Sequence, residues 1–398
     1  MRYEYVENSS NARITVFGVG GAGGNAINNM IAAGIKGVDF VTANTDKQAL
    51  EIAVSINKLQ LGANLTHGLG SGADPEKGAM AAEESVEAIR GAAENSDMIF
   101  ITAGMGGGTG TGASPIIARE CKNLGILTVA VVTKPFEFEG DKRMKTALLG
   151  IENLKKEVDT LLIIPNQRLK ALGNKDTSFL ELMKKADDVL LYAVKGISDL
   201  IIIPGFINLD FADVKKVMER MGTAIMGTGL ASGENRAIEA AQMAINSPLL
   251  EDISIDQAKG VLINVTGSNK MTMDEINEAS TFVKNEVHKE AEIIWGMVFD
   301  DSMGDEIRIT VIATGISDKR DRKVINIRDI EPESADSAWL KDGQENLDRP
   351  TFQRKMALQD TDMLKEETSL RPSKRSIVNR FFQREDLEYP TFLRKQAD

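Results

Sequence analysis

The sequence predicts an α/β fold: a parallel sheet covered by helices, a long helix, a smaller α+β domain with a mixed sheet, and a disordered tail. Three observations predict it. In residues 13–178, near-continuous runs of Val, Ile and Leu alternate with helical segments, which is typical of parallel strands buried on both faces. In residues 222–317, two strands follow one another directly, which favours a mixed sheet. Residues 318–384 are charged and poor in apolar side chains, so they cannot bury enough surface to offset the entropy of ordering.

The individual elements follow from these patterns. Apolar, β-branched runs predict strands in the first region at residues 13–17, 38–46, 98–103, 126–136 and 159–166. Helices are expected after the glycine turn at 18–24 and at 78–92, 114–124 and 179–201. The second region predicts helices at 234–245 and 274–292 and strands at 260–267, 292–300 and 306–315.

Composition narrows the class of protein. The chain has 398 residues and a net charge of −12, and residues 318–398 carry equal numbers of acidic and basic side chains. The negative charge therefore lies in residues 1–317, and an acidic body is a poor partner for nucleic acid. The first residues lack the pattern of a signal peptide, no apolar run is long enough to span a bilayer, and Cys121 is the only cysteine. We expect a cytoplasmic protein without direct membrane insertion.

Two glycine-rich loops follow strands of the predicted parallel sheet. One covers residues 18–24, and the other has six glycines in residues 104–112. Glycine lets backbone N–H groups approach anionic oxygens, a helix N-terminus adds partial positive charge, and Thr109 and Thr111 add hydroxyl donors. The alternative is that the glycines serve tight turns or close contacts between helix and sheet. Two such loops at neighbouring strand ends favour a phosphate site.

The identity of a phosphate ligand does not follow from the first loop alone. Gly18, Gly20 and Gly23 match the dinucleotide-binding pattern, with Asp39 or Asp46 as the acid that would follow. A nicotinamide-dependent oxidoreductase, however, has no use for the second glycine block, and His67 and His288 are the only histidines. The pattern of a P-loop enzyme is absent from the sequence.

Two segments are more specific. The sequence GGGTGTG at residues 106–112 resembles the signature of the tubulin superfamily. NLDFADVKKVM at residues 208–218 is similar to the catalytic loop and following helix of the FtsZ family of bacterial cell-division GTPases. The resemblance continues from about Arg13 to Ser317.

The resemblance implies a Rossmann-like GTPase domain joined by a long central helix to a mixed-sheet domain. The implied boundaries are a flexible N-terminus at 1–12, a nucleotide-binding domain at 13–178, a central helix at 179–203, a catalytic loop with the start of the next helix at 204–221, an α+β domain at 222–317, a disordered linker at 318–384 and a partner-binding peptide at 385–398. It also implies GTP and GDP as ligands, with Mg²⁺ held mainly by the nucleotide phosphates.

The resemblance implies a set of nucleotide-binding residues around the glycine loops. They are Gly20, Gly21, Gly24, Asn25, Asn44, Asp46, Gly72, Ala73, Gly104, Gly106, Gly107, Gly108, Thr109, Gly110, Thr133, Pro135, Glu139, Arg143, Asn166, Met183 and Asp188. Within this set, Glu139 would contact the ribose, and Asn166 and Asp188 would read guanine. Met183 stands where the family often has an aromatic residue against the base.

Asp210 and Asp213 lie three residues apart at a predicted helix start. Taken alone, they fit a helix cap and a favourable interaction with the helix dipole. The resemblance instead implies that these carboxylates and Asn208 are catalytic and act on the nucleotide of a neighbouring subunit. A head-to-tail contact of this kind is heterologous and generates an open filament. The implied product of assembly is a protofilament of the division ring at mid-cell.

The tail carries a second resemblance. PTFLRKQA at 390–397 is similar to the peptide by which this family binds membrane-tethering adaptors and division regulators, which points to Pro390, Phe392, Leu393 and Arg394. A near copy, PTFQRKMA, stands at 350–357. It is either an auxiliary docking site or a chance match in the linker.

A related regulator that binds GTP but assembles poorly is the runner-up function, and the intact Asp210 and Asp213 pair argues against it.

Overall fold

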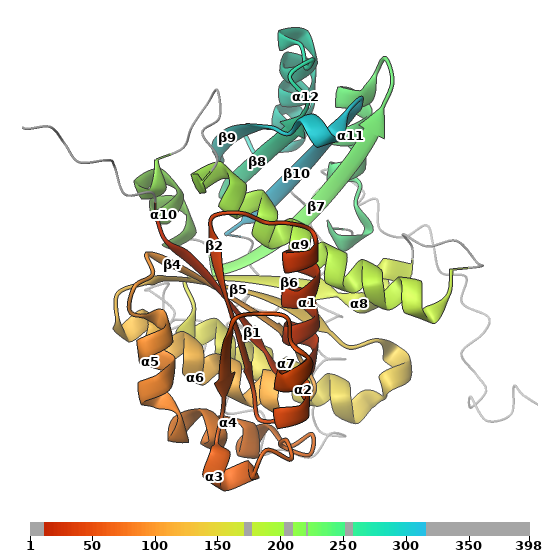
Figure 1. The fold of residues 1–398 in the computed structure, drawn as a ribbon. Helices are drawn as coiled ribbons and strands as arrows, with labels where there is room; N and C mark the ends of the chain where they lie inside the picture. Colours follow the sequence, from red (N-terminus) through yellow and green to blue (C-terminus); the bar gives the residue numbers. More distant parts are fainter. Residues whose placement is uncertain (1–11, 171–176, 203–209, 220–221, 251–257, 316–398) are drawn as a thin grey trace, which may run out of the picture. The chain divides into compact units, whose positions relative to one another are not determined.

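The computed structural model describes residues 12–170, 177–202, 210–219, 222–250 and 258–315 (Figure 1). The chain divides at Arg322 into two units, and all described residues belong to the first. The predicted N-terminal segment, linker and tail peptide lie outside the described residues, as does Asn208.

The first part of the fold is a parallel sheet with the strand order β3-β2-β1-β4-β5-β6. Its strands are β1 (Ile14–Val19), β2 (Val38–Asn44), β3 (Asn57–Gln60), β4 (Met98–Gly104), β5 (Leu127–Lys134) and β6 (Thr160–Pro165). The helices are α1 (Gly20–Ala32), α2 (Lys47–Ile52), α3 (Ala63–Thr66), α4 (Pro75–Glu84), α5 (Val86–Ala93), α6 (Thr109–Asn123), α7 (Asp141–Glu157), α8 (Asn166–Leu169) and α9 (Phe179–Ile202), with a 3₁₀ turn η1 (Glu137–Glu139).

The sheet continues without interruption into the second part. β7 (Gly222–Ser232) pairs parallel with β6, β10 (Glu306–Thr314) lies antiparallel between β7 and β8 (Gly260–Gly267), and β9 (Glu292–Phe299) pairs parallel with β8. The remaining elements are α10 (Phe211–Glu219), α11 (Arg236–Ile245), α12 (Met273–Glu286) and the 3₁₀ turns η3 (Pro248–Leu250) and η5 (Asp301–Met303). Parallel strands, a long helix and a mixed sheet confirm the predicted fold class.

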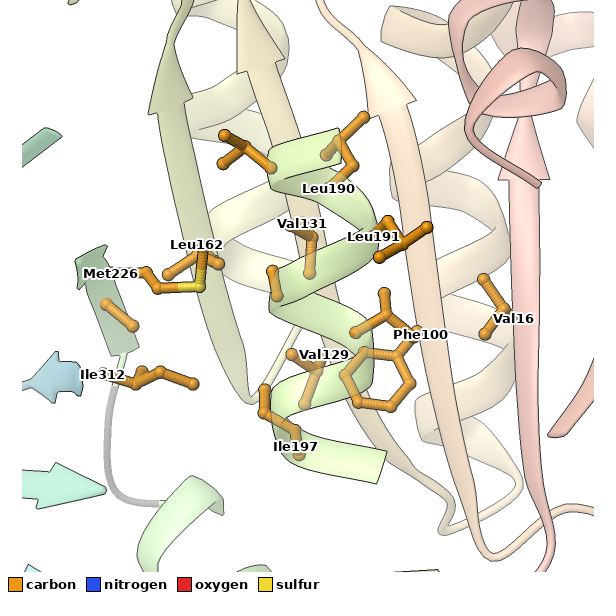
Figure 2. Close-up of a cluster of buried hydrophobic side chains, with 14 of the residues drawn as sticks. Val16, Phe100, Val129, Val131, Leu162, Leu190, Leu191, Ile197, Met226 and Ile312 are labelled. Atoms are coloured by element: carbon orange, nitrogen blue, oxygen red, sulfur yellow. The ribbon is translucent and has the colours of Figure 1, made fainter. Parts of the chain in front are cut away.

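Buried apolar side chains lie on both faces of the parallel strands. One cluster packs α1 and α9 against the sheet, and it contains Leu190, Leu191 and Ile197 of α9 with Val16, Phe100, Val129, Val131 and Leu162 of the strands (Figure 2). The same cluster includes Met226 of β7 and Ile312 of β10. A second cluster packs α4, α5, α6 and α7 against the opposite face. The helix α9 therefore packs against strands of the parallel first part of the sheet and against strands of its second part.

Several boundaries differ from the sequence predictions. The segment predicted as one helix at 78–92 is two helices that meet at Ser85, whose hydroxyl accepts a hydrogen bond from the Gly62 amide at 3.0 Å. The helix predicted at 274–292 ends at Glu286, because Val287 is extended. The helix predicted to start at Ser114 starts at Thr109, inside the glycine run.

Candidate nucleotide site

A cavity of about 340 Å³ lies where the parallel strands end. Its walls come from the ends of β1, β4, β5 and β6, from the segments that follow them, and from α9. The lining residues are Val19, Gly20, Gly21, Ala22, Asn25, Ser71, Gly104, Met105, Gly107, Gly108, Thr109, Gly110, Thr133, Pro135, Glu139, Arg143, Asn166, Met183, Ala186, Asp187 and Leu190. The carboxyl edge of a parallel sheet is where α/β proteins bind ligands.

The glycines of the two loops fall into two groups. A Cβ atom added at Gly21 or Gly107 would meet no atom within 4 Å, so the backbone at these two positions is open. A Cβ at Gly108 would collide with the Ser71 hydroxyl, and one at Gly112 would collide with the Pro75 carbonyl oxygen. Both interpretations of the glycine run therefore hold, each at different residues: some glycines expose backbone, and others let α4 and α6 pack closely.

Two helices of more than three turns begin at this cavity. α1 starts at Gly20 and α6 at Thr109, and neither Val19 nor Gly108 supplies a side-chain cap to the amides of the first turn. Uncapped N-terminal amides are donors aligned with the positive end of the helix dipole, which favours an anion. Arg143, at the rim, is the cationic side chain among the lining residues. These features fit a phosphate-bearing ligand.

The wall beside α9 has a different chemistry. Met183, Ala186, Asp187 and Leu190 share one helical face and line the cavity together with Asn166. The Asn166 side-chain oxygen is buried and has no hydrogen-bond partner among the described residues. Burial and the neighbouring charge of Asp188 raise the pKa of Asp187 to about 6. A buried acceptor and a carboxylate that lacks solvation suit a ligand that donates hydrogen bonds.

The predicted guanine reader Asp188 is not among the lining residues, whereas Asp187 is. In α9, residues 183, 186, 187 and 190 follow the i, i+3, i+4, i+7 spacing of one helix face, and residue 188 is rotated away from it. Helical spacing from Met183 could have identified Asp187 in the sequence.

The turn η1 and the helix α7, which follow β5, contribute Glu139 and Arg143 to the lining of the cavity. Glu139 accepts a hydrogen bond from the Phe136 amide at 2.8 Å, which closes the turn η1. Phe136 stacks on Phe138 with ring centroids 5.3 Å apart, and Phe138 meets Phe179 of α9 edge-on at 5.8 Å. This aromatic row links the turn that carries Glu139 to the start of the helix that carries Met183.

Other predicted site residues lie outside the lining. Asn44 is buried and accepts from the Asp46 amide at 3.2 Å, and Asp46 caps α2. Gly24 packs near Thr42, Gly106 packs against Arg143, and Gly72 and Ala73 are exposed with positive φ angles of 64° and 61°. The sequence prediction missed lining residues that stand beside predicted ones in the chain and further lining residues on the α9 face. The missed residues are Val19, Ala22, Ser71, Met105, Ala186, Asp187 and Leu190.

The dinucleotide alternative has no support from the acids that it requires. Asp39 is exposed and Asp46 caps α2, and neither lines the cavity. Gly18 and Gly23 pack against each other, since a Cβ on Gly18 would collide with the Gly23 carbonyl oxygen. Gly18 and Gly23 therefore serve close packing between β1 and α1, whereas Gly20 lines the cavity.

Asp210 and Asp213 are both exposed, and neither lines the cavity of its own chain. The Asp210 carbonyl accepts hydrogen bonds from the amides of Asp213 at 2.9 Å and Val214 at 3.3 Å, which places Asp210 at the N-cap position of α10. Asp210 thus occupies the cap position of α10, and both aspartates are exposed to solvent as well.

Within the described ranges, no group of three or more His, Cys, Asp or Glu side chains is arranged to hold a metal ion. No helix in the described part of the chain is long and apolar enough to cross a membrane.

Known proteins resemble this chain in sequence and structure. The profile of the Tubulin/FtsZ family, GTPase domain, matches residues 13–174, and that of the FtsZ family, C-terminal domain, matches residues 222–317. Cell division protein FtsZ of Rickettsia conorii is 58% identical over 304 residues, which cover 76% of this chain and 67% of that protein. Cell division protein FtsZ of Caulobacter vibrioides is 55% identical, with 76% and 60% covered.

Solved structures give the same result. The empty FtsZ dimer of M. jannaschii superposes with a TM-score of 0.74 at 46% identity, covering 77% of this chain and 89% of that one. CetZ2 of Haloferax volcanii, solved as a GTPγS-bound protofilament, superposes with a TM-score of 0.66 at 20% identity, covering 77% and 93%, which supports the fold alone. The chain belongs to the FtsZ family of the tubulin/FtsZ GTPases.

Proposed function

We propose that this chain binds GTP in the cavity, hydrolyses it to GDP and phosphate, and acts as a cytoskeletal protein of bacterial cell division. One observation carries the proposal: the order of the strands matches the order of the parts of a nucleotide. Uncapped helix N-termini follow β1 and β4, Thr133 lies at the end of β5 with Glu139 after it, and Asn166 follows β6. Neighbouring strands are about 4.8 Å apart, so the phosphate end and the base end are separated by roughly 10 Å, which leaves room for a ribose.

The base end favours guanine. A carboxylate accepts hydrogen bonds from both N1–H and the exocyclic amine of guanine, a pair of donors that adenine lacks. We assign this role to Asp187 in place of Asp188, with Asn166 as its partner, because these two line the cavity. Met183 packs against the base through its thioether.

The phosphate end is backbone-rich and has little charge of its own. Gly21, Gly107 and the first-turn amides of α1 and α6 supply donors, and Arg143 supplies one positive charge. Mg²⁺, bound mainly through the phosphates, would neutralise the charge that develops on the transferred phosphoryl group. The chain's own residues hold the triphosphate in position.

The acids complete the site from a second subunit. Asp210 and Asp213 are exposed and absent from their own cavity, so they are free to meet the cavity of a neighbour. There they would position the attacking water, which is the task that phosphoryl transfer leaves to the protein. The solved relative described as a dimer supports self-association. We propose head-to-tail protofilaments, a ring at mid-cell in the cytoplasm, and adaptor binding through Pro390, Phe392, Leu393 and Arg394.

Phosphate release from GTP, with ATP as the control substrate, tests this function across a range of protein concentrations. We expect a threshold concentration below which specific activity is near zero and above which it rises. A constant specific activity at every concentration would show that one chain holds a complete site. Equal turnover of ATP would contradict the assignment of Asp187.

A mixing experiment tests the shared site directly. Asp213→Asn removes an acid but leaves the cavity intact, and Gly21→Asp places a carboxylate in the open part of the phosphate cradle. Each variant alone should be inactive. Mixed, they should recover activity, because the cavity of the first meets the acids of the second. An inactive mixture that still forms filaments would place the acids in the same chain as the cavity.

A further inference from the structure

Three buried hydroxyl groups from separate loops meet beside the cavity. Thr45 follows β2, Ser71 precedes α4, and Thr109 begins α6. The Thr45 and Thr109 hydroxyl oxygens are 2.6 Å apart, and those of Ser71 and Thr109 are 3.1 Å apart. Ser71 and Thr109 line the cavity, whereas Thr45 is fully buried behind them. Thr45 was not part of the predicted site.

Thr45 also holds the loop at residues 66–73. Its carbonyl oxygen accepts from the Gly70 amide at 3.3 Å and from the Thr66 hydroxyl at 3.3 Å. Within this loop His67 and Ala73 have φ angles of 52° and 61°, and they are the only non-glycine residues with positive φ in the described part of the chain. Such backbone conformations are costly and persist where surrounding contacts enforce them.

Every favourable arrangement of the hydroxyl protons has Thr45 donating to Thr109. Three hydroxyls have three protons, and the chain uses two of them. If Thr45 donates to Thr109, one proton remains free at the cavity: that of Ser71 when Thr109 donates to Ser71, or that of Thr109 when Ser71 also donates to Thr109. The reverse order leaves a proton on Thr45, whose hydroxyl has Thr109 as its only partner within the described residues. A buried, unused donor is costly, so the Thr45 hydroxyl donates to Thr109 and the free proton of the three hydroxyls lies at the cavity.

We propose that Thr45 is a positioning residue that orients the hydroxyls of Thr109 and Ser71 toward the terminal phosphate of a bound nucleotide, and so couples that phosphate to the loop at residues 66–73. The proposal rests on the proposed nucleotide site. An anionic oxygen in the cavity accepts a hydrogen bond from the free hydroxyl of Ser71 or Thr109, and each hydrogen bond in the series polarises the next. Thr45 itself does not touch the ligand.

Two substitutions at Thr45 and one matched control test this role. Thr45→Val keeps the shape and removes the hydroxyl, and Thr45→Ser keeps the hydroxyl. The control is Thr42→Val, because Thr42 is equally buried, lies on the same segment, and pairs its hydroxyl with Ser55 at 2.7 Å away from the cavity lining. The measurements are the affinities for GTP and GDP and amide hydrogen exchange at Gly70, with and without GTP.

We expect Thr45→Val to bind GTP about fivefold to tenfold more weakly, the effect of losing the neutral hydrogen bond that orients Thr109, and to bind GDP with a smaller loss. Thr45→Ser should bind GTP within about threefold of the original chain, and Thr42→Val should be unchanged. GTP should slow exchange at Gly70 in the original chain and in Thr45→Ser, but not in Thr45→Val.

The proposal would be overturned by unchanged GTP affinity and Gly70 protection in Thr45→Val, or by a Thr45→Ser variant that binds GTP as weakly as Thr45→Val. An equal loss in Thr42→Val would reduce the effect to general stability and would also overturn it. If the original chain binds GTP, these results leave the proposed function standing. If the original chain binds no guanine nucleotide, both proposals fail together.

Discussion

Glu139 and Arg143 stand one helical turn apart at the rim of the cavity, with the Glu139 Oε2 atom 3.0 Å from the Arg143 Nε atom. The second carboxylate oxygen of Glu139 accepts the Phe136 amide. Gly106 packs directly against Arg143, because a Cβ on Gly106 would lie 2.8 Å from the Arg143 Cγ atom. The ion pair therefore fixes the only cation of the lining beside the glycine run.

Arg143→Ala should weaken GTP binding about tenfold, the usual effect of losing a charge-assisted hydrogen bond. The free energy of unfolding should change by less than about 1 kcal/mol, because exposed ion pairs contribute little. Lys122→Ala, which removes an exposed pair with Asp159 away from the lining, is the control and should leave GTP affinity unchanged. Calorimetry and urea unfolding give the two quantities. A large loss of stability in Arg143→Ala would mean that the pair is structural.

The pH dependence of GTP binding should report on Asp187. Its pKa is raised to about 6, so the carboxylate form that accepts from guanine is lost as pH falls through 6. GTP affinity should therefore decline from pH 7.5 to pH 5. In the ligand-free protein the sign is opposite: because the carboxyl pKa is raised from 3.8 to about 6, the folded state becomes less stable as pH rises between these two values.

Asp187→Asn should bind GTP more weakly at pH 7.5 and show a flatter pH profile. Asp188→Asn, changed at the neighbouring residue outside the lining, is the control: it should keep a pH-dependent affinity, but with the decline moved to lower pH, because the charge of Asp188 contributes to the raised pKa of Asp187. The opposite pattern, with the slope lost only in Asp188→Asn, would restore Asp188 as the guanine reader.

The two groups of glycines should respond differently to alanine. Gly107 has open space at its Cβ position and no positive φ, so Gly107→Ala should fold with stability within about 1 kcal/mol of the original and bind GTP more weakly. Gly112→Ala forces a methyl group against Pro75 and should cost about 1–3 kcal/mol of stability. Thermal unfolding and GTP titration separate the effects. Unchanged GTP affinity in Gly107→Ala would remove this residue from the phosphate cradle.

Met183→Phe should strengthen GTP binding about threefold to tenfold, because an aromatic ring on a base contributes roughly 0.5–1.5 kcal/mol beyond area burial. Met243→Phe, at an exposed methionine of α11, is the control. Competition between GTP and a fluorescent analogue measures the change. A weaker affinity in Met183→Phe would indicate that this face of α9 has no room for a stacked ring.

The sequence predicted the glycine loops and the parallel strands β1, β2, β4, β5 and β6 because both depend on local composition, but it missed the short strand β3. Strand β7 was missed because its residues Gly222–Ser232 are rich in Gly, Thr and Ala. Its glycines have a tertiary role: a Cβ on Gly227 or Gly229 would collide with a carbonyl oxygen of α11. Only the packed helix reveals why small residues occupy that strand.

The candidate site was predicted where motif and geometry coincide and was incomplete elsewhere. Met105, for example, lies between two predicted glycines and lines the cavity. A sequence motif lists residue types and does not show which neighbouring positions face a cavity. Asp188 was one residue away from the helix face that Asp187 occupies. Thr45 was out of reach, since its role depends on contacts with residues 64 positions away in the chain.

The pairing of β6 with β7 has a mechanical consequence. Only Thr160–Leu162 pairs with Gly222–Ala224 there, whereas β10 pairs with β7 from Glu306 to Thr314. Backbone ladders break abruptly under load, and apolar contacts yield gradually because they have no preferred direction. With so short a ladder at this seam, the two groups of strands are joined largely by the apolar side chains around α9. Under tension along its length, the protein should therefore deform at the β6–β7 pairing before its long strand ladders separate.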